Sequence, residues 1–209
     1  MTQALYETLD ALEDGIQEMG HLSPEYWNKM IHKIPAATSV DRVSWLVNRL
    51  AGKTILHIGC VGPLHDQLLK VCKRAYGIDL EPASYPFYTQ MDMDHLTGPL
   101  PLFAGVEVVL CAEVVEHLGN PRFLLEQLGE QYAECELIVT VPNAFSIAGQ
   151  SWMKKGIENV NLDHVAWYSY WTLTALLTKS GYEMCEWYWA GGAPLTAEGI
   201  VMVCRVSEK

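Results

Sequence analysis

Three side chains that can bind a metal ion or move a proton lie in one short stretch of the chain. Glu113, Glu116 and His117 form the pattern E-x-x-E-H directly after an apolar run. If this segment is helical, the spacing places all three side chains on one face. Two carboxylates and an imidazole suit a hard divalent cation, and a histidine can also serve as a general base near neutral pH.

A second chemical signal is a glycine turn followed by an acid. The run Thr54–Ile58 is apolar and branched, which is typical of a buried parallel strand. Gly59 and Gly62 follow it, where the backbone must turn sharply and a ligand can approach closely. Asp79 stands about twenty residues further on, where a carboxylate can accept hydrogen bonds from two ribose hydroxyls. The stretch therefore predicts a nucleoside pocket.

The dinucleotide fingerprint G-x-G-x-x-G is incomplete in this stretch, which reads G-C-V-G-P. Pro63 also removes an N–H group that would otherwise help to bind a phosphate. Both features disfavour a nicotinamide-dependent oxidoreductase, although they do not by themselves say which nucleoside is bound.

Apolar runs and turn residues predict the elements that must position these side chains. Helices are expected after Asp41, after Pro63, after Pro121 and from Ser169 to Ser180, each with a capping or first-turn residue typical of a helix start. The alternation predicts an α/β fold that ends in a glycine-rich antiparallel hairpin. The expected strands cover residues 54–58, 74–78, 87–91, 106–112, 136–141, 182–189 and 200–206.

Composition limits the classes of function. The chain has 209 residues, 50% of them apolar, and a net charge of −11. We expect one domain, and we expect no nucleic-acid partner, because phosphate binding needs a basic surface. The six cysteines form no C-x-x-C pair, and no signal peptide or membrane-length apolar run is visible, so we expect reduced thiols, no membrane partner and a cytoplasmic protein. The oligomeric state cannot be read from these features.

Residues 1–40 form a predicted helical preface to the core at residues 41–209. Leu5, Leu9 and Leu12 begin a helical repeat, and a second short helix carries Tyr26 and Trp27. The preface can simply pack on the sheet, or it can act as a lid whose aromatic rings face a bound cation.

Taken together, the motifs HIGCVG, GIDLEP and AEVVEHL resemble those of class I S-adenosylmethionine-dependent methyltransferases, in the same order. The likeness covers roughly Val43 to the end of the chain. It is nearest to the branch with G-C-V-G in the first loop and a later P-N-A-F-S, which is similar in turn to ubiquinone-pathway O-methyltransferases. The resemblance implies a Rossmann-like, seven-stranded mixed sheet in the order 3-2-1-4-5-7-6, with helices on both faces and an N-terminal helical lid.

The resemblance also implies which residues bind S-adenosylmethionine. Asp79 would hold the ribose, Asp92 would face the exocyclic amine of adenine, and Met93 would pack against the ring. The complete set of residues expected at the cofactor is His57, Gly59, Cys60, Val61, Gly62, Asp79, Leu80, Asp92, Met93, Cys111 and Glu113.

For E-x-x-E-H the resemblance leaves two interpretations open. Similar O-methyltransferases and small-RNA 2′-O-methyltransferases use such a motif to hold a metal, and the RNA enzymes add a later histidine, which His164 matches. The metal set would then be Glu113, Glu116, His117 and His164, holding a divalent cation such as Mg²⁺. In other relatives the histidine closes the cofactor pocket, and the glutamate corresponding to Glu116 caps or bonds backbone.

One residue departs from the family pattern. His57 stands where the family usually has an acid, and a neutral imidazole supplies no negative charge there. Another acid such as Glu113 can replace it, or cofactor binding is weakened. This departure keeps open the alternative of a non-catalytic methyltransferase-like protein that binds S-adenosylmethionine.

The predicted reaction is methyl transfer to a small-molecule acceptor, at oxygen. His164 or His117 would take the proton of the acceptor hydroxyl. Asn143, at the end of a predicted strand, would either hold that hydroxyl or only shape the turn. The unpatterned segment from Ala144 to Val165 is assigned, with the preface, to the acceptor pocket.

Overall fold

The chain divides into two compact units, Met1–Pro35 and Ala36–Lys209, and every strand and helix of the described residues belongs to the second. The predicted preface at residues 1–40 lies mostly outside the described residues, as do Tyr26 and Trp27, so the lid stays a prediction. The computed structural model describes residues 32–96, 98–192 and 196–208.

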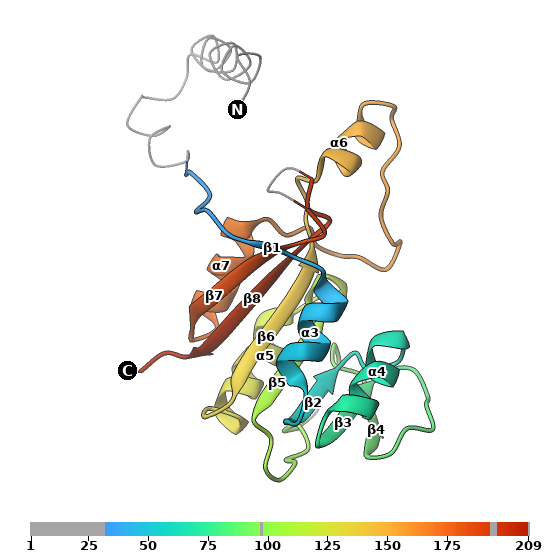
Figure 1. Ribbon diagram of the computed structural model, residues 1–209, viewed down its shortest axis with the longest axis vertical. Helices are drawn as coiled ribbons and strands as arrows, with labels where there is room; N and C mark the ends of the chain where they lie inside the picture. The colour runs from blue at the N-terminus through green and yellow to red at the C-terminus, as the bar shows by residue number, and fades with distance from the viewer. Residues whose placement is uncertain (1–31, 97, 193–195, 209) are drawn as a thin grey trace. The chain divides into compact units, whose positions relative to one another are not determined.

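An eight-stranded mixed sheet forms the centre of the second unit (Figure 1). Its order is β1-β7-β8-β6-β5-β2-β3-β4, with β8 antiparallel to both neighbours and every other pair parallel. The strands are β1 (Ser39–Val40), β2 (Thr54–Ile58), β3 (Arg74–Asp79), β4 (Tyr88–Gln90), β5 (Val108–Ala112), β6 (Glu136–Pro142), β7 (Tyr182–Ala190) and β8 (Gly199–Val206).

The sheet differs from the predicted seven-stranded one by β1, which adds a two-residue strand beside β7 at one edge. Nothing in the sequence marks so short a strand. The other seven strands lie in the order 3-2-1-4-5-7-6 when they are numbered from β2.

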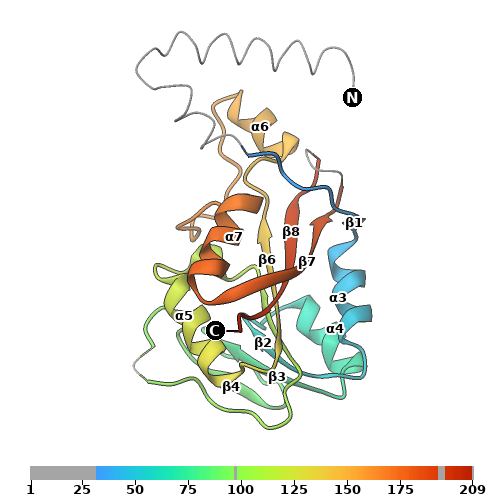
Figure 2. The ribbon, with the colours of Figure 1, turned by 90° about the vertical axis from the view of Figure 1, so that its left-hand side faces the viewer.

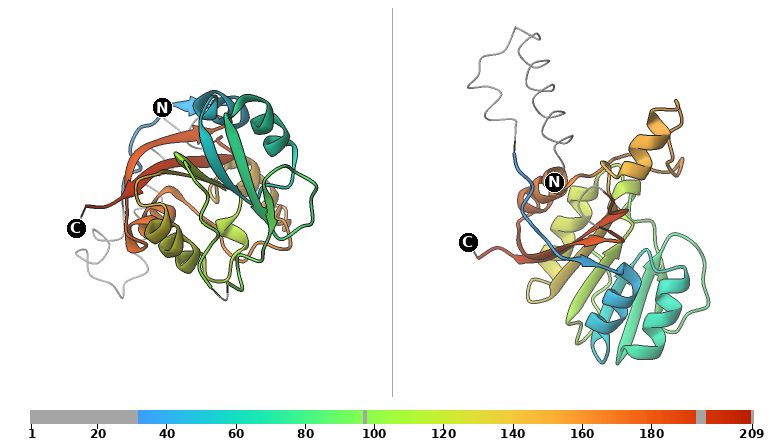
Figure 3. Two further views of the ribbon diagram at one scale, coloured as in Figure 1. Left: turned by 90° about the horizontal axis from the view of Figure 1, so that it is seen from below. Right: turned by 45° about the horizontal axis from the view of Figure 1, so that its top comes forward.

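Helices cover both faces of the sheet. Helices α3 and α4 pack on one face, and α5 and α7 pack on the other (Figures 2 and 3). Helix α6 extends beyond the end of the sheet and has no buried residue. No helix among the described residues is long and apolar enough to span a membrane. The helices are α3 (Arg42–Leu50), α4 (Pro63–Val71), α5 (Pro121–Gln131), α6 (Ile147–Met153) and α7 (Tyr170–Lys179), with a 3₁₀ turn η1 (Val115–His117).

Alternation along the strands separates two apolar clusters. In β2, Ile55 joins the cluster beneath α3 and α4, whereas Leu56 joins the cluster beneath α5 and α7. Successive side chains of a strand point to opposite faces, so a strand covered on both faces must be apolar throughout. This explains why β2 and β5, in the middle of the sheet, are continuous apolar runs, whereas β7 alternates.

Capping residues confirm the predicted helix starts. The Asp41 carboxylate accepts a hydrogen bond from the Ser44 backbone N–H at 2.8 Å, at the start of α3. Ser169 and Thr172 bond each other's backbone at the start of α7, and Pro63 is the first residue of α4. The Asp41 and Ser169 caps supply acceptors for N–H groups that the helix itself leaves free, whereas Pro63 has no N–H group that needs one.

The E-x-x-E-H segment is not one helix, which corrects the expectation that its three side chains share a face. Glu113 adopts a left-handed backbone with φ of 56°, and only Val115–His117 forms a 3₁₀ turn. The reversal at Glu113 turns its side chain out of line with Glu116 and His117.

Two buried histidines lie beneath the glycine turn. The Nδ1 atom of His57 in β2 is 3.1 Å from Nδ1 of His65 in α4, so one ring donates and the other accepts. Neither Nε2 atom has a hydrogen-bond partner within the described part of the chain. Burial, and secondarily the nearby His65, lower the pKa of His57 to about 3. Burial also lowers the pKa of His65, although Asp66 and Asp79 oppose this shift.

We expect this pair to make the fold sensitive to acid. A histidine whose pKa is lowered by folding binds its proton more readily in the unfolded chain. Its contribution to stability is therefore complete above about pH 6.5 and is lost as the pH falls toward about 3. Between about pH 6.5 and 5, His57 alone should cost about 2 kcal/mol of unfolding free energy. Urea unfolding of the native chain and of His57→Gln at both pH values measures this difference; equal pH dependence of the two proteins would contradict it.

Candidate functional site

The turn after β2 is fixed by backbone geometry and by one carboxylate. Gly59 adopts a φ of +70°, and its N–H donates to the Ile78 carbonyl at 2.8 Å. The Val61 backbone N–H donates to Oδ2 of Asp79 at 2.6 Å, and the Glu81 N–H donates to Oδ1 at 3.0 Å. Asp79 therefore ties the turn to the end of β3, and each of its oxygens keeps further accepting capacity.

A cleft of about 510 Å³ opens beside this turn, and we call it the Asp79 cleft. Val61 and Leu80 line it and are 41% and 58% exposed, so the cleft offers apolar contact beside the carboxylate. Its lining is Gly59, Val61, Asp79, Leu80, Glu81, Asp92, Met93, Asp94, His95, Glu113, Val114, His117, Leu118 and Asp163.

A smaller cleft of about 180 Å³ adjoins it, and we call it the Arg42 cleft. The two clefts share Gly59, Val61 and Glu113. The Arg42 cleft is lined by Arg42, Val43, His57, Gly59, Cys60, Val61, Gly62, Pro63, Leu64, Ala112 and Glu113.

These two clefts bring together the residues predicted to bind a cofactor, with one exception. Cys111 is fully buried within β5, belongs to the cluster beneath α5 and α7, and lines neither cleft. Asp92 lines the Asp79 cleft, but its oxygens accept from the Asp94 N–H and bond the His95 ring, both at 2.9 Å. These bonds lower the pKa of Asp92, so its carboxylate is held ionised.

Glu113 forms an ion pair that the sequence did not indicate. Its Oε1 lies 2.5 Å from Nη1 of Arg42 and accepts a hydrogen bond from the Thr140 hydroxyl at 2.8 Å. The Arg42 cleft therefore holds a fixed cation and a fixed anion beside the neutral His57. Arg42 is the main residue that sequence reasoning missed, because its partner lies far along the chain and no local motif links them.

Glu116, His117 and His164 form a cluster that could hold a metal ion, with ligand atoms within 4.8 Å of one another. Glu116 is 1% exposed, and neither of its carboxyl oxygens has a hydrogen-bond partner among the described residues. This differs from the interpretation in which the glutamate caps or bonds backbone. Burial, and secondarily Glu113, raise the pKa of Glu116 to about 8. Glu113 itself is directed toward Arg42 and is not part of the cluster.

Backbone hydrogen bonds bring His164 to this cluster. The Glu116 carbonyl accepts from the N–H groups of Val165 and Ala166 at 2.9 and 3.2 Å. As a result the ring of His164 meets the ring of His117 edge to face, with centroids 4.5 Å apart. Burial lowers the pKa of His164, and His117 adds to that shift, which favours the neutral imidazole.

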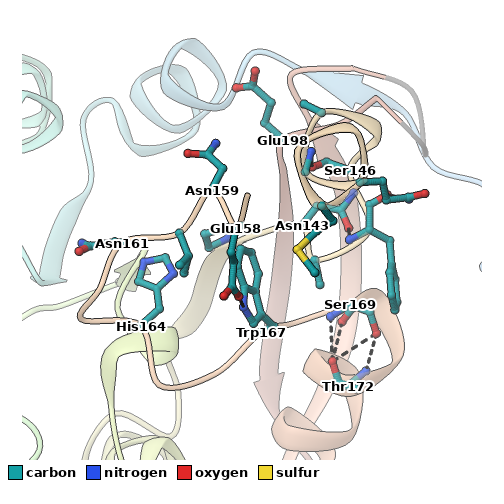
Figure 4. Close-up of a pocket in the computed structure, with 18 residues that line it drawn as sticks. Asn143, Ser146, Glu158, Asn159, Asn161, His164, Trp167, Ser169, Thr172 and Glu198 are labelled. Atoms are coloured by element: carbon teal, nitrogen blue, oxygen red, sulfur yellow. Dashed lines mark hydrogen bonds between the residues drawn. The ribbon is translucent and has the colours of Figure 1, made fainter. Parts of the chain in front are cut away.

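A third hollow, of about 820 Å³, lies at the end of β6, and we call it the Asn143 cavity (Figure 4). It includes much of the segment predicted to form the acceptor pocket. Asn143 donates to the Ala197 carbonyl at 3.0 Å and accepts from the Phe145 N–H at 3.1 Å, so its amide shapes the turn. The lining is Pro142, Asn143, Ala144, Phe145, Ser146, Ala148, Gly149, Gln150, Met153, Glu158, Asn159, Val160, Asn161, His164, Trp167, Ser169, Thr172 and Glu198.

The two histidines join the hollows. His117 lines the Asp79 cleft, His164 lines the Asn143 cavity, and the rings are in contact. A ring that lines one hollow therefore contacts a ring that lines the other.

Comparison with known proteins shows the fold. No protein-family model and no curated protein matches the sequence. Solved structures do match. The small RNA methyltransferase HEN1 is 18% identical over 86% of this chain, with a TM-score of 0.64, but this chain spans only 27% of that protein.

Two further matches are methyltransferases of similar length. Magnesium protoporphyrin IX methyltransferase from Synechocystis PCC 6803 is 18% identical, with 79% of this chain and 80% of that chain covered and a TM-score of 0.55. The N-methyltransferase NodS from Bradyrhizobium japonicum WM9 is 19% identical, with 80% and 86% covered and a TM-score of 0.54. Both were solved with S-adenosylhomocysteine. The described unit therefore has the Rossmann-like α/β fold of S-adenosylmethionine-dependent methyltransferases.

The geometry of the turn predicts a steep cost for Gly59→Ala. A Cβ atom there would lie 2.4 Å from Cγ2 of Val114, in addition to the strain of a positive φ. Gly52→Ala is the matched control, because Gly52 has a φ of +76° and a Cβ atom added to it would meet no described atom within 4 Å. We expect about 1–2 kcal/mol of destabilisation at Gly52 and about 2–4 kcal/mol at Gly59. Urea unfolding measures the loss of stability in both variants. An equal loss would show that the Val114 side chain moves aside without a cost in free energy.

Proposed function

We propose that the protein is an S-adenosylmethionine-dependent methyltransferase that transfers a methyl group to the oxygen of a small-molecule acceptor. The observation that carries this proposal is the contact between His117, which lines the Asp79 cleft, and His164, which lines the Asn143 cavity; we call this contact the junction. A transferase needs two substrates to meet at one point, and the contact between these two rings supports placing that point here. The branch similar to ubiquinone-pathway O-methyltransferases is part of the proposal and rests on the sequence motifs alone.

The Asp79 cleft suits the nucleoside part of the cofactor. The free lone pairs of Asp79 face a cleft in which a ribose diol can donate to them, and Val61, Leu80 and Met93 offer apolar contact for a purine. Asp92 remains the proposed acceptor for the adenine amine, since its ionised carboxylate lines the same cleft.

The Arg42 cleft suits the amino-acid part of the cofactor. His57 is neutral there, but Glu113 supplies the acid that the family usually has in its place. Arg42 and Glu113 together offer opposite charges to a zwitterion. This pairing weakens the argument for a non-catalytic binding protein, which rested on His57. A turnover assay separates the two, because a binder without activity would hold the cofactor and leave it unchanged.

The side chains at the junction would position the acceptor and accept its proton. When bound, the cofactor supplies an electrophilic methyl group and a neutral leaving group, so little acid catalysis is needed. Alignment alone can contribute about 7–11 kcal/mol. His164 lines the Asn143 cavity, and its lowered pKa keeps it able to take the acceptor's proton; His117 is the second candidate. Because the Asn143 amide is already bonded to backbone, we assign it to shaping the cavity.

Glu116, His117 and His164 also fit a divalent cation such as Mg²⁺. A buried carboxyl group without a partner is unfavourable by itself, and a cation would satisfy both of its oxygens. These three residues would hold the ion, and the ion would lower the pKa of a hydroxyl nearby. Glu113, expected as a further ligand, has its carboxylate on Arg42 and Thr140 instead. Metal binding and proton transfer compete, because a nitrogen bound to a metal cannot accept a proton.

The net charge of the chain favours a small-molecule acceptor over a nucleic acid. HEN1 is a small RNA methyltransferase, whereas NodS and the magnesium protoporphyrin IX enzyme are not described as acting on RNA. With a net charge of −11, this chain would repel the phosphates of a nucleic acid.

Asp79→Asn tests the assignment of the nucleoside. We expect the affinity for S-adenosylhomocysteine to fall about 10- to 100-fold, because charge-assisted hydrogen bonds to the diol are replaced by weaker ones. Isothermal titration calorimetry measures the dissociation constant. Glu81→Gln is the matched control, since Glu81 lines the same cleft, and it should change the constant little. Unchanged affinity in Asp79→Asn would reject the ribose assignment.

Glu116→Gln tests the proposed metal site. We expect the native chain to bind Mn²⁺ saturably and the variant to bind it at least about tenfold more weakly, because the carboxylate ligand is lost. Electron paramagnetic resonance of free Mn²⁺ gives the binding curve. Glu134→Gln, at an exposed glutamate, should bind like the native chain. Binding that survives Glu116→Gln would place the ion elsewhere.

A further inference from the structure

The Asn143 cavity has an acidic lining. Two of its side chains are carboxylates, Glu158 and Glu198, and among its described lining residues there is no lysine or arginine. The nearest basic residues in sequence are Lys154 and Lys155 at the end of α6, and the Lys155 ammonium lies 5.0 Å from the centre of the Trp152 ring. The cavity therefore attracts positive charge and repels negative charge.

One carboxylate is placed beside an aromatic ring. Trp167 donates from Nε1 to Oε1 of Glu158 at 3.1 Å, and Figure 4 shows the two side chains together near the centre of the cavity. Trp167 is 43% exposed, so part of its surface remains available to a ligand. A carboxylate next to an accessible indole suits an organic cation, which gains both charge pairing and cation–π attraction.

This subsite lies next to the proposed reacting centre. The ring centroids of Trp167 and His164 are 6.1 Å apart, and His164 in turn contacts His117. A molecule with its positive group at Glu158 can therefore present another group to the histidines.

The rest of the cavity offers apolar contact. Phe145 and Met153 line it with large apolar side chains that remain mostly exposed, and α6 has no buried residue. Exposed apolar surface that gathers around a cavity favours an apolar ligand body.

We propose that the acceptor is an organic cation, with an apolar or aromatic body and a protonated amine received by Glu158 and Trp167. That the cation is the methyl acceptor rests on the proposed function, whereas the cation subsite is a property of the Asn143 cavity itself. A phosphate-bearing acceptor would meet Glu158 and Glu198 without a lysine or arginine of the described lining to pair with it.

Three probes with the same hydroxyphenyl ring test the proposal: tyramine, 4-ethylphenol and 4-hydroxyphenylacetate. They carry a cationic, a neutral and an anionic end. Calorimetry with S-adenosylhomocysteine comes first, and the probes are then titrated into the full chain saturated with it. We expect tyramine to bind at least about tenfold more tightly than 4-hydroxyphenylacetate, since the carboxylates attract one and repel the other.

Variants connect the preference to the subsite. Glu158→Gln should weaken the binding of tyramine about five- to tenfold and leave the affinity for 4-ethylphenol unchanged, because the substitution removes only the charge. Glu130→Gln, at an exposed glutamate of α5, should change neither affinity. The proposal is overturned if tyramine shows no saturable binding, if 4-hydroxyphenylacetate binds as tightly, or if Glu158→Gln binds tyramine like the native chain.

Two outcomes separate this inference from the proposed function. If S-adenosylhomocysteine does not bind, the methyltransferase proposal fails; the same titrations on the cofactor-free chain still decide the cation subsite. If a short single-stranded RNA displaces tyramine, the acceptor is a nucleic acid and the inference is wrong.

Discussion

The hydrogen bond between the Asp79 carboxylate and the Val61 amide is the constraint on which the site geometry depends. It joins the end of β3 to the turn after β2. Gly59, in the same turn, bends with a positive φ against Val114, which follows β5. Three strand ends are thereby held at one edge of the sheet, where ligands bind in open α/β folds. The walls of the Asp79 cleft are thus fixed by the protein itself, which lowers the entropy that a ligand must lose on binding.

Local signals made much of the fold predictable. Apolar runs identified most of the strands from β2 to β8, and alternation identified β7. Asp41, Pro63 and Ser169 marked helix starts, because helix starts depend on neighbouring residues. Strand β1 was missed, because pairing of two residues at a sheet edge leaves no pattern in the sequence. Helix α6 was missed too, since it buries no face and so has no apolar period.

The site was predictable only where its residues follow one another. The glycine turn and Asp79 lie in one strand–helix–strand unit, and the structure brings them together as the motif predicts. The partner of Glu113 was not predictable, because Arg42 comes from another element. The left-handed backbone at Glu113 was not predictable either, because that conformation is usually marked by a glycine in the sequence. Cys111 was placed at the cofactor by resemblance, but it points into the core from β5.

The carboxyl group of Glu116 lowers the stability of the folded protein. A carboxyl group that is fully buried without a described partner opposes folding, unlike the ion pair of Arg49 with Glu136 and Glu186, which links α3 to β6 and β7. Such groups are typical of functional sites, where chemistry rather than stability selects the residue. The backbone of Glu116 nevertheless holds the segment that carries His164, so the same residue also organises the junction.

The antiparallel strand β8 has a consequence for how the chain folds as it is made. Residues 199–206 insert between β6 and β7, which precede them in sequence. During synthesis, the backbone N–H and C=O groups on the facing edges of β6 and β7 lack partners until β8 has been made. A nascent chain halted before residue 199 would expose both edges. The sheet should therefore close late in biogenesis, and this waiting interval is the one in which a chaperone would be most useful.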